Sequence, residues 1–92
     1  MNAHLQETAD LLLEFILPFP GEKGWDEVMV YLDVTDITLH LLLTEIEKDT
    51  PGLLYKISDI HERPVAVGVV EEKKAALLRF LSEGGFRGNA HF

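Results

Sequence analysis

The sequence predicts an α+β fold: an antiparallel β-meander of three to four strands, with an N-terminal and a C-terminal helix packed on one face of the sheet. Three observations support this fold class. Apolar residues recur at helical spacing near both ends of the chain, apolar and polar residues alternate in its middle, and prolines and glycines separate these segments. Consecutive strands with short connections usually pair antiparallel, and helices at the two ends can then cover one face.

The first helix is predicted to begin after Asn2, whose side chain is suited to capping a helix N-terminus. One apolar face follows at spacings of four, three and four residues: Leu5, Ala9, Leu12 and Ile16. Pro18 and Pro20 end this helix, and residues 18–24 have the proline and glycine content of a loop.

Two strands are predicted across the centre of the chain. Residues 28–34 alternate with period two, and residues 37–44 continue the alternation after Thr35 and Asp36, which suggests an antiparallel hairpin. Because Thr-Asp is not a favoured two-residue turn, we expect a longer or bulged connection. The sheet face away from the helices would then carry side chains of mixed polarity, among them Met29, Tyr31, Leu42 and Leu54.

Pro51 and Gly52 predict a turn before a third strand at residues 53–58. Residues 65–70 are either a fourth short strand or the approach to a helix.

A C-terminal helix is predicted to begin near residues 71–72, two glutamates that suit the positive end of a helix dipole. Gly84 and Gly85 supply a left-handed stop for it. Residues 86–92 are either a last edge strand or a frayed end.

Composition limits the class of protein. The chain of 92 residues is 47% apolar and 26% charged, which is typical of one globular domain, so residues 1–92 are interpreted as a single acidic domain. A formal net charge of −8 disfavours binding to nucleic-acid phosphates and to anionic membranes. Glu7 and Asp10 precede the apolar run 11–17 and Glu14 interrupts it, unlike a secretory signal, so we predict a cytoplasmic protein.

No residue pattern predicts catalysis, a metal centre or a cofactor. Ser58 and His61 are close in sequence, but catalytic groups are assembled in space and no glycine-framed nucleophile motif surrounds them. Asp59, His61 and Glu62 offer oxygen and nitrogen donors, yet no further ligand follows at a fixed short spacing. The glycines of residues 84–88 follow a helix, which favours a helix cap over a phosphate-binding loop. We therefore predict a non-enzymatic protein.

The acidic residues are unevenly distributed. Seven of them lie between positions 26 and 49 against a single lysine there, a net of six of the eight excess negative charges: Asp26, Glu27, Asp33, Asp36, Glu45, Glu47 and Asp49. Two interpretations remain open. The charges can keep apolar strands soluble and discourage edge pairing, or they can form a docking surface for a basic partner.

Three short features are considered together: a Trp-acid-acid-Val sequence opening the first predicted strand, a tyrosine on that strand, and an Asp-Ile pair after the third, namely Trp25, Asp26, Glu27, Val28, Tyr31, Asp59 and Ile60. In these features and in the order of its predicted elements, the chain resembles the YezG-like bacterial immunity proteins, small antidotes that bind and neutralise toxins delivered between competing bacteria. The resemblance covers about two-thirds of the chain. It departs in the second predicted strand, which is leucine-rich where the family tends to be aromatic, and no toxin-contacting residue is transferred.

The predicted function is that of a cytoplasmic immunity or inhibitor protein that binds and neutralises a basic toxin, for instance a nuclease, through the acidic hairpin. Aromatic residues should be the hot spots and acids should steer the approach. The predicted partner-binding residues are Trp25, Asp26, Glu27, Tyr31, Asp33, Asp36, Glu45, Glu47 and Asp49. The alternative is a homodimeric structural or regulatory module without catalytic activity, because a small domain with apolar strands gains stability by association.

Overall fold

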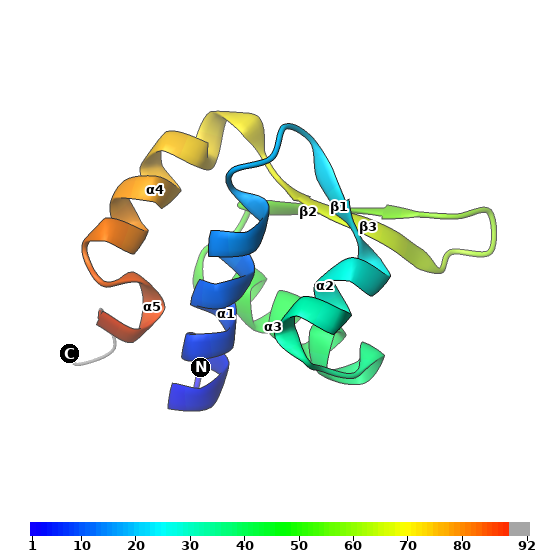
Figure 1. Ribbon diagram of the computed structural model, residues 1–92, viewed down its shortest axis with the longest axis horizontal. Helices are drawn as coiled ribbons and strands as arrows, with labels where there is room; N and C mark the ends of the chain where they lie inside the picture. The colour runs from blue at the N-terminus through cyan, green and yellow to red at the C-terminus, as the bar shows by residue number, and fades with distance from the viewer. Residues whose placement is uncertain (89–92) are drawn as a thin grey trace.

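A computed structural model of the chain, which describes residues 1–88, combines helices with a three-stranded antiparallel sheet (Figure 1). The α+β class and the antiparallel sheet are therefore confirmed. In chain order the elements are α1 (Ala3–Ile16), β1 (Glu22–Gly24), α2 (Trp25–Leu32), α3 (Asp36–Asp49), β2 (Leu54–Ser58), β3 (Pro64–Val69), a 3₁₀ turn η1 (Glu71–Lys73), α4 (Lys74–Ser82) and α5 (Gly85–Gly88).

The sheet has the strand order β1-β3-β2, so the last strand in sequence lies in the centre. Both pairings are antiparallel, with Lys23 and Lys56 on either side of Val67. The β2–β3 hairpin extends away from the helices to one side of the molecule (Figure 1). The pairing of β1 with β3 closes a segment that contains α2 and α3 and holds both helices against the sheet.

The predicted hairpin of residues 28–34 and 37–44 is wrong, because α2 and α3 occupy these positions. Val28 is buried, with Met29 and Leu32 packed against the core, and these positions are one and four residues apart as on a helical face. In α3 the buried residues Leu39, Leu42 and Ile46 are three and four residues apart, which is also the spacing of a helical face. A sequence whose apolar residues alternate and also recur at helical spacings can form either a strand or a helix. The predicted sheet face with Met29, Tyr31 and Leu42 consequently does not exist.

The other strand predictions have mixed outcomes. The third strand predicted at residues 53–58 is β2, and of the two interpretations of residues 65–70 the strand is correct, as β3. Residues 22–24, predicted as loop, form the short edge strand β1. The C-terminal segment is not an edge strand up to residue 88, because residues 85–88 form α5, and residues 89–92 lie outside the described part of the chain.

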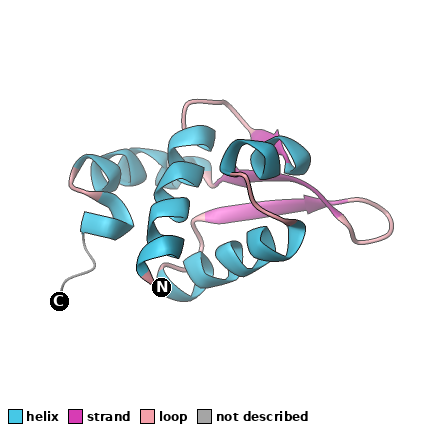
Figure 2. Ribbon diagram, turned by 60° about the horizontal axis from the view of Figure 1, so that its bottom comes forward, coloured by secondary structure: helices cyan, strands magenta, loops and turns pink. Residues whose placement is uncertain are grey.

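Side chains of the helices and of one face of β3 share the core. Val67 and Val69 of β3 are buried on this face, whereas Tyr55 and Ile57 belong to the opposite face and remain accessible. The buried apolar residues are Ala9, Leu12, Leu13, Ile16, Leu17, Trp25, Val28, Leu39, Leu42, Ile46, Leu53, Val67, Val69, Leu77 and Phe86. Every helix from α1 to α5 contributes to this set, so the C-terminal helices are part of the same domain. Helices α4 and α5 lie beside α1, at the end of the molecule away from the β2–β3 hairpin (Figure 2).

A buried carboxylate joins α5 to α1. Asp10 accepts hydrogen bonds from the backbone N–H groups of Phe86, at 2.8 Å, and Arg87, at 3.2 Å. Gly85 has a φ of +64°, and a Cβ atom there would collide with the Asp10 carboxylate. Phe86 also packs edge-to-face on Phe80 of α4, with ring centroids 4.9 Å apart. These contacts fix the position of the C-terminal helices beside α1.

Candidate functional site

Helices α2 and α3 are joined by a three-residue turn. Asp33 adopts a left-handed conformation, with φ +55°, that ends α2. Thr35 then caps α3, because its hydroxyl accepts a hydrogen bond from the Thr38 N–H at 3.2 Å. A pair of helices linked in this way is a helix–turn–helix, and the β2–β3 hairpin that follows it lies in the place of a wing (Figure 1). We call this hairpin, residues 54–69, the wing.

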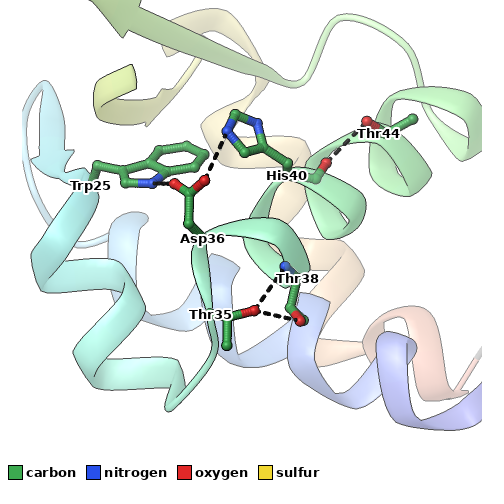
Figure 3. A network of polar contacts seen from close by, with 6 residues as sticks. All are labelled: Trp25, Thr35, Asp36, Thr38, His40 and Thr44. Carbon is green, nitrogen blue, oxygen red and sulfur yellow. Dashed lines mark hydrogen bonds and ion pairs between the residues drawn. The ribbon is translucent and has the colours of Figure 1, made fainter. Parts of the chain in front are cut away.

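A polar network fixes α2 relative to α3 (Figure 3). The Trp25 indole N–H donates to a carboxylate oxygen of Asp36 at 2.8 Å, and His40 Nε2 lies 3.6 Å from the other oxygen of that carboxylate. The rings of Trp25 and His40 are also in contact, with centroids 4.9 Å apart. Because Trp25 begins α2 and Asp36 begins α3, these contacts join the first turns of the two helices.

Trp25, predicted as a partner-binding aromatic, is only 4% exposed. Its ring is part of the core and its single polar atom is already hydrogen-bonded to Asp36. Trp25 and Asp36 therefore position the helix–turn–helix. Tyr31, the other predicted aromatic, is 51% exposed and remains available for contact.

The outer faces of α2 and α3 expose large apolar side chains. Val30 on α2 is 80% exposed and Ile37 on α3 is 79% exposed, and Leu41 lies one turn after Ile37 on the same face. Neither helix carries an arginine, and Lys48 is their only lysine. This combination of exposed apolar groups with acidic and few basic groups is the main chemical feature of the helix–turn–helix.

The predicted acidic residues do not converge on one patch. Asp26 and Glu27 lie in the first turn of α2, and Asp33 lies in the turn between the helices. The others lie along α3, which rises about 20 Å between its first and last residues; they are Asp36 in the first turn and Glu45, Glu47 and Asp49 towards the end. The structure thus distributes the seven acids over the first turns of both helices, the turn between them and the end of α3.

Helix electrostatics explain some of these acids but not all. Asp26 and Glu27 stabilise α2, because negative charge is favourable at the N-terminal end of the helix dipole. Glu47 and Asp49 lie at the C-terminal end of α3, where the dipole disfavours them. Local bonds offset part of this cost: Glu47 accepts from the Gly52 N–H at 3.3 Å and Asp49 accepts from the Thr50 hydroxyl at 3.0 Å.

A hollow of about 470 Å³ lies on the outer face of α2, and we call it the α2 hollow. Its lining residues are Phe15, Asp26, Glu27, Val30 and Tyr31. The rings of Phe15 and Tyr31 are stacked, with centroids 4.1 Å apart and planes within 12° of parallel. Of the predicted site residues, the structure brings together Asp26, Glu27 and Tyr31 here.

A cation of the chain already lies at the margin of the α2 hollow. The Lys23 ammonium group is 3.6 Å from the centre of the Phe19 ring and 5.2 Å from that of Phe15. It is also 3.6 Å from a carboxylate oxygen of Glu27. Aromatic rings and a carboxylate thus hold a positive charge at this point of the surface.

A second groove, also about 470 Å³, separates α3 from the edge strand β2. Its lining is mixed in polarity and consists of His40, Leu43, Thr44, Glu47, Lys48, Leu54, Tyr55, Lys56 and Val67. On the far face of the sheet, the Tyr55 ring crosses over Gly68 and its hydroxyl donates to Glu22 at 2.9 Å. This bond to a carboxylate favours the neutral phenol and raises the pKa of Tyr55.

The tip of the wing is an ordered loop. The Asp59 carboxylate accepts from the backbone N–H groups of His61 and Arg63, at 2.8 and 3.0 Å, and pairs with the Arg63 guanidinium at 3.1 Å. Hydrogen bonding from the Arg63 N–H is the main cause that lowers the pKa of Asp59. Ile60, at the tip, is 93% exposed. The role of Asp59 is therefore structural: its carboxylate binds the backbone of His61 and Arg63 and holds the turn.

Within residues 1–88, no group of three or more histidine and acidic side chains is placed to hold a metal ion. The described helices include none that is long and apolar enough to cross a membrane. No protein-family model, curated protein or solved structure matches the chain. The resemblance to YezG-like immunity proteins stays a prediction.

Proposed function

We propose that this domain is a protein-binding helix–turn–helix module, which docks on a basic protein partner through the exposed faces of α2 and α3. The observation that carries the proposal is the chemistry of this surface: Val30, Tyr31, Ile37 and Leu41 are exposed beside acidic residues, with Lys48 as the one cation of the two helices. Such a surface complements a partner that is both apolar and positively charged.

The same surface is unsuited to DNA. In DNA-binding helix–turn–helix proteins the second helix lies in the major groove, and lysine and arginine residues contact the phosphates. Here α3 would bring four acids and one lysine towards the phosphates: Asp36, Glu45, Glu47, Asp49 and Lys48. Repulsion would oppose binding at both ends of the helix, and no counterion release would offset it.

The exposed apolar side chains supply binding energy. Val30 and Ile37 are about four-fifths exposed, and complete burial of such a side chain contributes about 1.5–3 kcal/mol. The acids around them would act mainly on the association rate, because long-range attraction orients a basic partner before contact. The resemblance found in the sequence leads us to propose a toxin as this partner, with the domain acting as its inhibitor.

The experiment uses purified wild-type protein to capture binding proteins from a lysate of the source cells. Each captured protein is then purified, and its affinity is measured directly at low and high salt. Ile37→Asp should weaken binding by about a hundredfold, because it would place a charge where the complex buries an apolar side chain. Leu78→Asp is the matched control: Leu78 is also an exposed apolar residue, but it lies on α4, away from the helix–turn–helix (Figure 1).

Two results would overturn the proposal. One is equal binding of a reconstituted partner by wild-type protein and Ile37→Asp. The other is tight, salt-sensitive binding of fluorescently labelled duplex DNA in an anisotropy assay.

A second candidate function rests on the open edge of β2. Within residues 1–88 this strand pairs only with β3, and it borders the groove beside α3, so it could pair with β2 of a second copy and form the predicted homodimer. Light scattering over a wide range of concentrations tests this function, and a mass that stays monomeric at every concentration excludes it.

A further inference from the structure

We infer that the α2 hollow binds an arginine side chain of the basic partner. This inference rests on the proposed function and specifies how part of that surface recognises its partner. It follows from the shape of the hollow, from its unpaired charge and from the chemistry of its lining, each taken in turn below.

The α2 hollow is an open depression with aromatic walls. The stack of Phe15 on Tyr31 holds both rings in place, and Val30 extends the apolar wall along α2. The depression is open to solvent, so the long apolar stem of a basic side chain can lie along it. The walls would contact the methylene groups of that stem, and the charged head would reach the carboxylates at the rim.

The rim carries unbalanced negative charge. Glu27 is partly compensated by Lys23, but Asp26 has no ion pair within the described residues. The N-terminus of α2 opposes a cation with the equivalent of only about half a positive charge, whereas each carboxylate carries a full negative charge. The net field at the hollow therefore favours a positively charged ligand.

The chemistry of the lining favours guanidinium over ammonium. A guanidinium group is planar, so it can stack on an aromatic ring and donate two hydrogen bonds to a carboxylate, and the hollow offers both kinds of group. The point-like ammonium of Lys23 already occupies the position between the rings of Phe15 and Phe19 at the margin. The arginine of the partner would therefore bind away from Lys23, beside Tyr31 and Asp26.

The experiment is a titration of ¹⁵N-labelled full-length protein with three capped tripeptides, Gly-Arg-Gly, Gly-Lys-Gly and Gly-citrulline-Gly. Citrulline keeps the shape of arginine without its charge. The arginine peptide should shift backbone amide signals around Phe15 and in residues 26–31, the lysine peptide should bind more weakly, and the citrulline peptide should leave the signals unchanged.

Two variants and their controls complete the test. Asp26→Asn and Tyr31→Ala should each weaken arginine-peptide binding by about tenfold. Asp33→Asn makes the same change of charge outside the hollow, at a left-handed position that asparagine tolerates, and should bind like wild type. Tyr31→Phe keeps the ring and should also bind like wild type.

The inference is overturned if the three peptides shift the same signals equally, if no signal of the hollow moves, or if Asp33→Asn weakens binding as much as Asp26→Asn does. Its failure is distinguishable from failure of the proposed function. A partner whose binding depends on Ile37 but not on Asp26 or Tyr31 refutes the arginine site alone.

Discussion

Replacement of Asp10 by alanine should release the C-terminal helices from α1. The substitution removes the acceptor for two backbone N–H groups, those of Phe86 and Arg87. A hydrogen bond to a charged group contributes about 1.5–3 kcal/mol, and a buried donor left without a partner costs about 1–3 kcal/mol. Phe86 is buried, so its amide cannot be rehydrated in the native position, whereas Arg87 is exposed and its amide can regain water. We expect a loss of about 2–4 kcal/mol, a large share of the stability of a small domain.

Urea denaturation measures this loss, and amide hydrogen exchange locates it. Exchange at Phe86 should accelerate strongly in Asp10→Ala, while amides in α3 should exchange only as fast as the lower global stability requires. Asp10→Asn keeps one oxygen acceptor and should lose less. Glu14→Ala is the control, because Glu14 is an exposed acid on the same helix and its removal should cost within about 0.5 kcal/mol. A free energy of unfolding for Asp10→Ala within that margin of wild type would refute the reasoning.

Three further predictions concern the sheet, the wing and the helix–turn–helix. In Gly68→Ala the new Cβ would lie about 2.6 Å from the Tyr55 hydroxyl oxygen, so the ring must move, with an expected cost of about 1–3 kcal/mol that a Tyr55→Ala background should largely remove in a double-mutant cycle. Because the pKa of Asp59 is lowered in the folded state, its stabilising contribution is complete above the ordinary value of 3.8 and is lost as pH falls through the lower folded pKa. NMR of the wing should show this acid transition, and its persistence in Asp59→Asn would contradict the assignment. Trp25→Phe removes the indole donor to Asp36 and part of the core volume, so circular dichroism melting should show a loss of about 1–3 kcal/mol, and an unchanged melting temperature would show that the network does not stabilise the fold.

The misassigned central segment shows why local patterns have limited reach here. Apolar residues at alternate positions between residues 28 and 43 are also three, four and seven apart in several combinations, so both a strand and a helix can bury them. Thr35 as a helix cap and Asp33 as a left-handed stop were visible in the sequence as residue types, but a turn between strands uses the same types. The bond from Trp25 to Asp36 and the pairing of β1 with β3 favour the helices, and both depend on the folded chain.

The candidate site was predictable in its chemistry and not in its grouping. The excess of acids between residues 26 and 49 is a property of the sequence, as is the presence of Tyr31 among them. The stack of Phe15 on Tyr31 joins residues of α1 and α2, and no sequence pattern indicated it. Asp10 had a weak signal, since it is an acid next to the predicted apolar face of the first helix, but its partners Phe86 and Arg87 are more than 70 positions away.

Composition and local spacing were sufficient to predict the α+β class, the first helix, the strand at residues 53–58 and the excess of acids between residues 26 and 49. These properties depend on residue type and on contacts between near neighbours. The helical state of α2 and α3, the burial of Trp25 and the separation of the acids along these helices depend on packing between distant segments. The proposed docking surface therefore has a charge that can be counted in the sequence and a shape that arises only when α2 and α3 pack against α1 and the sheet.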